Sequence, residues 1–179
     1  MKPLQAVGCG LLLILLNVVI EGFDLLPNPL GWALVLLGLV ALRPRLSTGT
    51  PVLAAAITAT VVSVPLWIPG VAEAVSEADP ALGWALSLPQ VVFTALFFHA
   101  LHQLAKAAGD DDAGGWLQIC WVGAIIVGVL PALLLPLGVG GPLLALAGVF
   151  SLLVGLLQVV LSFAYAERSW ARSATATPR

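Results

Sequence analysis

The chain has 179 residues, of which 60% are hydrophobic and only 9% are charged, and its mean hydropathy is +1.08. Water-soluble domains do not reach these values, so the composition predicts an integral membrane protein. The formal net charge is −2, and the seven basic residues are too few and too dispersed for a nucleic-acid-binding surface. Cys9 and Cys120 both lie inside apolar segments and are interpreted as small buried hydrophobes rather than a disulfide.

Six apolar segments are typical of transmembrane helices, and we therefore predict an all-α, six-helix membrane bundle. The predicted helices cover residues 4–21, 29–42, 51–69, 80–106, 116–136 and 142–166. They form one transmembrane domain at residues 1–166, followed by a disordered cytoplasmic tail at 167–179. Crossing the hydrocarbon core takes about 20 helical residues, so the second helix is short.

A capping residue followed by proline recurs at the predicted helix starts. A proline at the first helical position loses no hydrogen bond, and an Asn, Thr or Asp before it can cap the exposed N–H groups. Pro27, Asn28 and Pro29 are predicted to form the turn that starts the second helix. The other pairs of this kind are Thr50-Pro51 and Asp79-Pro80.

The distribution of charge predicts the orientation, because short cytoplasmic loops carry Lys and Arg. With the N-terminus inside, all basic residues fall on the cytoplasmic side, and both termini are cytoplasmic. These residues are Lys2, Arg43, Arg45, Lys106, Arg168, Arg172 and Arg179. The tryptophans are predicted to anchor the chain at the two membrane interfaces, with Trp32, Trp67 and Trp84 outside and Trp116, Trp121 and Trp170 inside.

An internal repeat relates the second and fourth predicted helices. Leu30-Gly-Trp-Ala-Leu-Val-Leu36 and Leu82-Gly-Trp-Ala-Leu-Ser-Leu88 match at six of seven positions with a shift of 52 residues. This pattern favours parallel hairpin repeats formed by helices one-two and three-four. The alternative is that Leu, Gly, Ala and Trp are common at this interface.

Polar residues near the first hairpin form a candidate ion or proton site. If the first helix continues to Asp24, then Asn17, Glu21 and Asp24 lie on one face, and Gln90 can face them from the fourth helix. Burial and a second nearby acid both raise the pKa of a carboxyl group, so Glu21 and Asp24 can share a proton. In the alternative interpretation both acids stand in water at the helix end.

His99 and His102 are a second, weaker candidate site, because an i, i+3 histidine pair can share a metal ion. The alternative is a pair of hydrogen-bonded histidines near the cytoplasmic interface. Asp110, Asp111 and Asp112 are interpreted as part of a solvated loop. The sequence contains none of the catalytic motifs of hydrolases, metalloproteases or nucleotide-binding enzymes, so we expect no enzymatic activity and no cofactor.

The first hairpin carries one family resemblance. Phe23-Asp24-Leu-Leu-Pro27-Asn28-Pro-Leu-Gly31-Trp32 resembles a hairpin of small multi-pass bacterial membrane proteins of unknown function. The resemblance covers about 25 residues and implies a bacterial inner (plasma) membrane protein, without catalytic residues. The family pattern usually has Asp where this chain has Asn28, which retains a capping group but removes a charged ligand.

Two functions are compatible with these features. The first is a non-enzymatic membrane partner or scaffold, whose small-residue helix faces pack against a second copy or another membrane protein within the lipid bilayer. It predicts a dry bundle. The alternative is a small transporter-like or channel-like protein with a proton or cation site at Glu21 and Asp24, which predicts a polar internal cavity. We expect the scaffold on the sequence alone.

Overall fold

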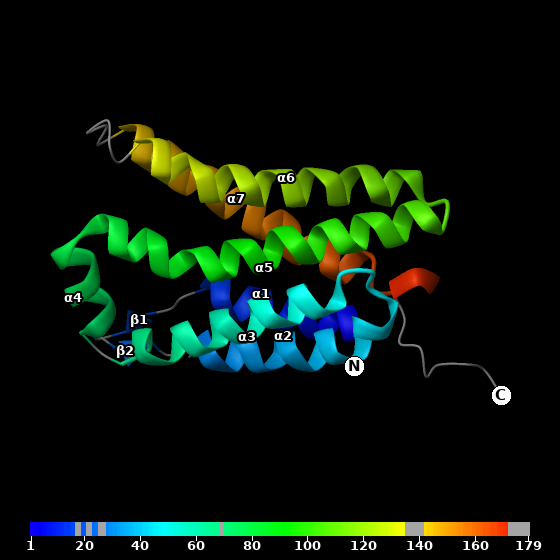
Figure 1. Cartoon of the computed structure of the whole chain (residues 1–179), viewed down its shortest axis with the longest axis horizontal. Coiled ribbons are helices and arrows are strands. Elements are labelled where there is room, and N and C mark those ends of the chain that lie inside the picture. Colours follow the sequence, from blue (N-terminus) through cyan, green and yellow to red (C-terminus); the bar gives the residue numbers. More distant parts are fainter. Residues whose placement is uncertain (17–18, 21–22, 25–27, 69, 135–141, 172–179) are drawn as a thin grey trace.

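The computed structural model describes residues 1–16, 19–20, 23–24, 28–68, 70–134 and 142–171 (Figure 1). These residues form an all-α bundle with one pair of two-residue strands. The main elements are α1 (Pro3–Leu16), β1 (Val19–Ile20), β2 (Phe23–Asp24), α2 (Asn28–Leu42), α3 (Gly49–Leu66), α4 (Val71–Ala78), α5 (Pro80–Ala107), α6 (Asp111–Leu134) and α7 (Pro142–Ala164). Two short 3-10 helices, η1 (Arg43–Arg45) and η2 (Ser169–Ala171), lie at one end of the bundle.

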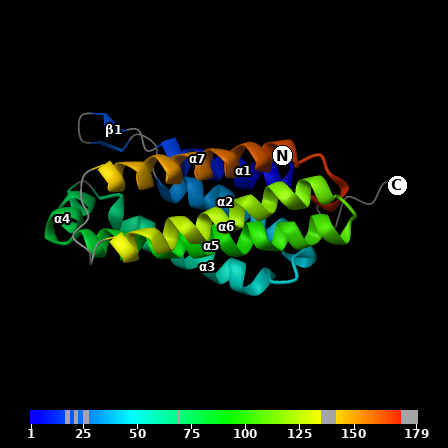
Figure 2. The same cartoon turned by 90° about the horizontal axis from the view of Figure 1, so that it is seen from above.

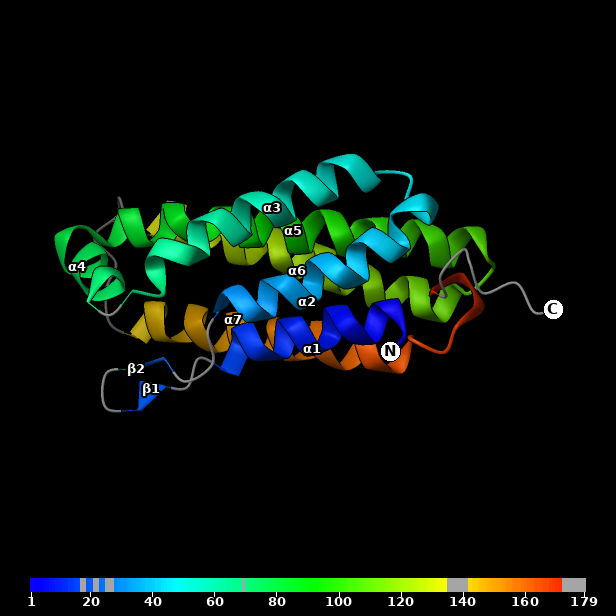
Figure 3. The same cartoon turned by 90° about the horizontal axis from the view of Figure 1, so that it is seen from below.

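Six helices form a ring in chain order. Helix α1 packs against α2, α2 against α3, α3 against α5, α5 against α6 and α6 against α7, and α7 returns to α1 (Figures 1, 2 and 3). The N-terminus and η2 lie at one end, which we call the terminal end. The strands and α4 lie at the opposite end, which we call the hairpin end, and α4 packs there against α5 and α3.

Four of these helices contain stretches long and apolar enough to cross a membrane: Gly49–Leu66, Ala81–Ala107, Asp111–Leu134 and Ala145–Ala164. Helices α1 and α2 have only 14 and 15 residues. At about 1.5 Å per residue they are shorter than a hydrocarbon core of about 30 Å. Helices α3 and α5 extend beyond them toward the hairpin end (Figure 3).

The first helix ends earlier than we predicted. It stops at Leu16 rather than at residue 21, and β1 pairs with β2 in an antiparallel register that joins Val19 to Asp24 and Ile20 to Phe23. The physical reason is that β1 consists of the β-branched residues Val19 and Ile20, whose side chains favour extended backbone.

Two helix starts also differ from the prediction. Helix α6 begins at Asp111 rather than at residue 116, because the carboxylate of Asp110 accepts a hydrogen bond of 3.3 Å from the Ala113 N–H and so caps the helix. Helix α3 begins at Gly49, before the predicted cap Thr50. The Asp79 cap is confirmed, since its Oδ1 accepts from the Ala81 N–H at 2.8 Å.

Helices α1 and α2 pack closely at their glycines. A Cβ atom added at Gly10 would lie 2.4 Å from the carbonyl oxygen of Gly31, and one added at Gly38 would lie 2.4 Å from the carbonyl oxygen of Pro3. Gly31 and Gly38 are one heptad apart and therefore lie on nearly the same face of α2. Small residues thus let the two backbones approach each other, as is common between membrane helices.

An aromatic cluster fills the middle of the ring. Trp32 of α2 contacts Phe93 of α5 edge-on at 5.3 Å between ring centroids, Phe93 stacks on Phe97 at 5.5 Å, and Phe97 contacts Phe98 at 5.4 Å. All four side chains are buried. The prediction that Trp32 anchors the chain at an interface is therefore wrong, because its ring packs into the core.

The other tryptophans are divided between surface and interior. Trp67 and Trp116 are exposed, as membrane-interface anchors are. Trp84 is half-buried, and its Nε1–H donates to the Gly128 carbonyl oxygen of α6 at 2.9 Å. In the two copies of the predicted repeat, Trp32 and Trp84 therefore have different environments, and the duplication stays a prediction.

Residues 167–171, which we predicted to begin a disordered tail, pack against the bundle and include η2. Trp170 and Ala171 are buried, and the Trp170 Nε1–H donates to Asp110 Oδ2 at 3.2 Å. Arg168 contacts the same carboxylate at 3.5 Å, and Lys2 pairs with Glu167. This segment, residues 167–171, is called the C-terminal strap below.

Candidate functional site

The predicted ion or proton site is only partly within the described residues. Asn17 and Glu21 lie outside them, and Asp24 is in β2, where only the backbone is described. The predicted alignment requires a first helix that continues to Asp24, whereas α1 ends at Leu16 and Asp24 lies in β2. Gln90, the fourth predicted member, lies on α5 beside two internal cavities.

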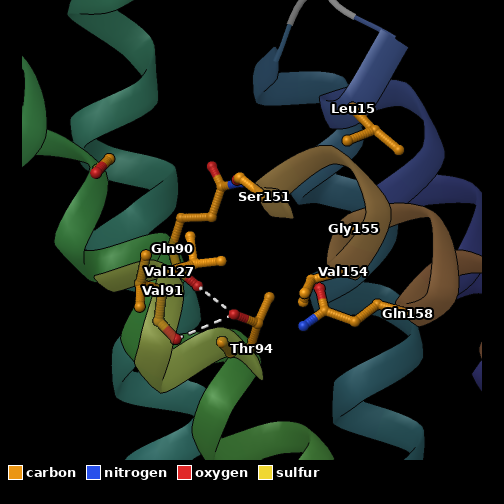
Figure 4. A pocket seen from close by; sticks show the side chains of 11 residues that line it. Leu15, Gln90, Val91, Thr94, Val127, Ser151, Val154, Gly155 and Gln158 are labelled. Carbon is orange, nitrogen blue, oxygen red and sulfur yellow. Dashed lines mark hydrogen bonds between the residues drawn. The ribbon is translucent and has the colours of Figure 1, made fainter. Parts of the chain in front are cut away.

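The two cavities adjoin each other at Ser87 and Gln90. One, of about 180 Å³, is enclosed by α1, α5, α6 and α7, and we call it the α7 cavity (Figure 4). The other, of about 150 Å³, is enclosed by α2, α3 and α5, and we call it the α3 cavity. Ser87 and Gln90 line both and are exposed, so both cavities are accessible from the surface.

Polar side chains face each other across the α7 cavity. Thr94 of α5 is 6% exposed, and its hydroxyl donates to the carbonyl oxygens of Gln90 at 3.2 Å and Val91 at 3.0 Å. Gln158 of α7 is 5% exposed, and its Nε2 makes only a long contact of 3.5 Å with the Cys120 carbonyl oxygen. Its carboxamide points toward Thr94 (Figure 4).

The α3 cavity is lined by Asn28, one residue of the predicted helix-start turn. Asn28 is the first residue of α2, and its buried Oδ1 has no hydrogen-bond partner among the described residues, so the predicted cap is not made there. Pro29 lies in the first turn as predicted, and Pro27 lies outside the described residues. The other buried polar group is Ser63, whose hydroxyl donates to the Thr60 carbonyl oxygen at 2.8 Å.

The aromatic cluster separates the cavities from the terminal end. Trp32 lines the α3 cavity, and Phe93 and Phe97 follow Gln90 along α5 toward the terminal end. Phe93 and Phe97 are both 0% exposed. An apolar constriction of this kind resists water, so the α3 cavity, which Trp32 lines, ends at an aromatic floor.

The two histidines lie beyond this floor in a separate hydrogen-bond network. The Ser47 hydroxyl donates to Gln103 Oε1 at 3.0 Å, and Gln103 Nε2 is 2.9 Å from His99 Nε2. His102 Nδ1 lies 2.8 Å from the Gly114 carbonyl oxygen. A carbonyl oxygen only accepts, so His102 carries its hydrogen on Nδ1.

This network corresponds to the hydrogen-bonded alternative for the histidines. Their ring centroids are 6.3 Å apart, and His99 also contacts the Trp121 ring edge-on at 5.1 Å. Within the part of the chain that the structure describes, no three His, Cys, Asp or Glu side chains gather to form a metal site. His99 Nδ1 and Trp121 Nε1 are buried there without a hydrogen-bond partner.

Sequence reasoning missed most of the α7 cavity. Ser87, Gln90 and Thr94 have spacings of three and four, which place them on one face of α5, and this pattern was available as a signal. Gln158 of α7 is not among the site residues predicted from the sequence. Its long contact with Cys120 does cross from α7 to α6, but its carboxamide also lines the cavity.

A third hollow is an apolar groove of about 480 Å³ on the surface between α6 and α7, lined by residues that include Gln118, Ile126 and Phe150. It contains few polar groups. No known protein family, curated protein or solved structure matches the chain, so the family resemblance of the first hairpin stays a prediction.

Proposed function

We propose that this chain is a transporter-like or channel-like protein of the bacterial inner membrane, with six spans and a polar vestibule open to the outside. The vestibule consists of the α7 cavity and the α3 cavity. The observation that carries the proposal is that these two cavities adjoin each other at Gln90, inside an otherwise apolar bundle. No enzymatic activity is part of the proposal.

The cost of polar groups in a membrane interior supports a functional vestibule. Burying an amide or hydroxyl group without a compensating hydrogen bond costs about 1–3 kcal/mol in proteins. Gln90 is exposed and Ser151 is half-buried, and neither makes a side-chain hydrogen bond within the described part of the chain, so in a lipid environment both would bear this cost unless water reached them. Water or a solute in the vestibule would satisfy these groups, whereas a scaffold would gain more from apolar side chains.

Charge at the terminal end supports the proposed orientation. Lys2, Arg45 and Arg168 all make contacts there, with Glu167, the Ser169 carbonyl oxygen and Asp110 respectively. Cytoplasmic ends of membrane proteins are enriched in such residues. The terminal end is then cytoplasmic, the hairpin end is outside, and the aromatic floor closes the vestibule on the cytoplasmic side.

Thiol accessibility tests the vestibule directly. In a protein carrying Cys9→Ala and Cys120→Ala, we expect Gln90→Cys to react with a charged, membrane-impermeant thiol reagent added from outside. A thiol reacts as the thiolate, which forms in water but not in lipid. Leu37→Cys is the control, because Leu37 is 68% exposed on the apolar surface. Equal, slow reaction of the two variants would contradict the proposal.

A second candidate function is the membrane scaffold predicted from the sequence, and the apolar groove between α6 and α7 favours it. A groove of this kind can take a helix of a second copy. Resonance energy transfer between labelled copies in liposomes measures such association, and Ile126→Trp, which fills the groove, should weaken it. Association that survives this substitution would mean that the groove is not the contact surface.

A further inference from the structure

We infer that the α7 cavity binds a small uncharged solute with hydrogen-bonding groups, of the amide or polyol type, rather than a cation. The inference rests on the proposed function, because it names the class of solute that the vestibule admits. It concerns the wall formed by Ser87, Gln90 and Thr94 of α5 and by Ser151 and Gln158 of α7.

The hydrogen-bond inventory of the wall fits a neutral solute. The hydroxyl hydrogens of Thr94 and Ser87 point to backbone carbonyl oxygens, so these side chains offer only acceptor lone pairs to the cavity. Gln90 makes no side-chain hydrogen bond with the described residues, so its carboxamide offers both donors and an acceptor. A solute with both N–H or O–H donors and an acceptor oxygen would match this set.

Gln158 is the most informative member of the wall. It is 5% exposed and its carboxamide points into the cavity (Figure 4). Its Nε2 makes one contact of 3.5 Å with the Cys120 carbonyl oxygen, a distance at which a hydrogen bond is weak. A buried amide aimed into a cavity with its hydrogen-bonding capacity largely unused is a group that a ligand would complete.

The absence of charge from the wall argues against a cation. Each described residue that lines the α7 cavity is apolar or neutral, and no carboxylate is among these residues. A cation moved from water into this site would lose its hydration and gain only neutral oxygens at a partly apolar wall. A neutral solute loses far less hydration energy on entry.

The size of the cavity limits the solute to a few heavy atoms. A volume of about 180 Å³ corresponds to roughly six water molecules at about 30 Å³ each. Urea, acetamide and glycerol fit within this volume and carry the required donors and acceptors. These three compounds are therefore suitable probes.

The test measures whether a probe protects a thiol in the cavity. Ser87→Cys in the protein without Cys9 and Cys120 is reconstituted in liposomes and labelled from outside with a charged thiol reagent. We expect saturable protection by at least one probe. At about nine times its Kd the labelling rate should fall about tenfold, because only the unoccupied protein reacts. Ala78→Cys, exposed at the hairpin end outside the cavities, is the control and should show no protection.

Two further variants locate the binding groups. Thr94→Val keeps the shape of the side chain and removes its oxygen, and Gln158→Leu removes the amide. Each should weaken protection of Ser87→Cys at least tenfold in apparent Kd, while unprotected labelling continues at its usual rate. Because Gln158→Leu changes a buried residue, the folding of this variant is checked by size-exclusion chromatography. If Gln158→Leu does not fold, Thr94→Val alone tests the inference.

The other outcomes overturn the inference. Protection by sodium or potassium ions and not by the three probes would make the cavity a cation site. No protection at all would leave it filled with water only, and equal protection of Ala78→Cys would reveal a general solvent effect. If Ser87→Cys is labelled but no probe protects it, the vestibule is accessible and only the proposed solute class is refuted. If Ser87→Cys is not labelled at all, the proposed function itself is refuted.

Discussion

The contact between α1 and α2 predicts a large effect from a single methyl group at Gly10. A Cβ atom there would lie 2.4 Å from the Gly31 carbonyl oxygen and 2.7 Å from Val35 Cγ2, whereas ordinary contact begins at 3.4 Å. In Gly10→Ala the helices must therefore separate by about 1 Å or rotate. Overpacking of this kind costs about 1–3 kcal/mol.

The helix propensity of alanine offsets part of this cost. Alanine favours a helix over glycine by up to about 1 kcal/mol, so we expect a net loss of about 1–2 kcal/mol in the free energy of unfolding. Reversible unfolding in mixed micelles, followed by circular dichroism, measures this quantity. Gly148→Ala is the matched control, since a Cβ at Gly148 meets no atom within 4 Å, and it should be neutral or slightly stabilising.

The difference in stability between Gly10→Ala and Gly148→Ala tests whether α1 and α2 pack as closely as the structure shows. If Gly10→Ala is as stable as Gly148→Ala, the α1–α2 distance is larger than the structure shows and the reasoning is refuted. Gly38→Ala provides an independent check one heptad away, because its Cβ would lie 2.4 Å from the Pro3 carbonyl oxygen. It should lose a similar amount of stability.

Three other predictions follow from the terminal end and the core. The hydrogen bond from Trp170 lowers the pKa of Asp110 below its usual 3.8. The C-terminal strap is therefore stabilised above pH 3.8 and is released as the pH falls through the lowered pKa. A change in tryptophan fluorescence at acid pH measures the release, and it should be absent in Trp170→Phe. Asp110→Asn should weaken the strap by about 1–3 kcal/mol at neutral pH, seen as faster hydrogen exchange in η2, and unchanged exchange would contradict this. Phe97→Ala should cost about 3–5 kcal/mol in unfolding free energy, because the side chain is fully buried, and a loss below 1 kcal/mol would place it outside the core.

Apolar composition was enough to predict the helical bundle, but local signals fixed only some of its boundaries. Asp79 caps α5 as its place before Pro80 predicts. Asn28 and Thr50 also precede prolines, yet Asn28 Oδ1 is unpartnered within the described residues and α3 begins before Thr50. A capping residue before proline is therefore not a sufficient signal, because the tertiary position of the side chain decides whether it turns back to the helix.

Long-range contacts explain the features that sequence reasoning could not find. The C-terminal strap has the composition of a disordered segment, but Trp170 is held by Asp110, which lies 60 residues earlier. The acidic run that contains Asp110 was interpreted as a solvated loop for the same reason. The local role of Asp110 is only to cap α6 through Ala113, and no local pattern indicates that its second carboxylate oxygen accepts from a tryptophan at the far end of the chain.

In the candidate site, too, local spacing predicts one part and long-range contacts determine the rest. Gln90 was predicted from its depth in the fourth helix, and its spacing from Ser87 and Thr94 defines a polar face on α5. The sequence does not state which helix this face meets. Ring closure between α7 and α1 brings Gln158 and Ser151 opposite α5, and that contact depends on the whole bundle.

The energetics of packing favour a cavity that is filled in use. An empty space of about 180 Å³ would cost about 4 kcal/mol at roughly 24 cal/mol per Å³, a large share of a typical folding free energy of about 5–15 kcal/mol. Collapse is limited because the walls already touch on both sides: a Cβ at Gly128 would lie 2.6 Å from Val91 Cγ1, and one at Gly155 would lie 2.9 Å from Leu15 Cδ1. These contacts set the separation of α5 from α6 and of α1 from α7, and the polar wall between them offsets the cost of the cavity only when water or a solute occupies it.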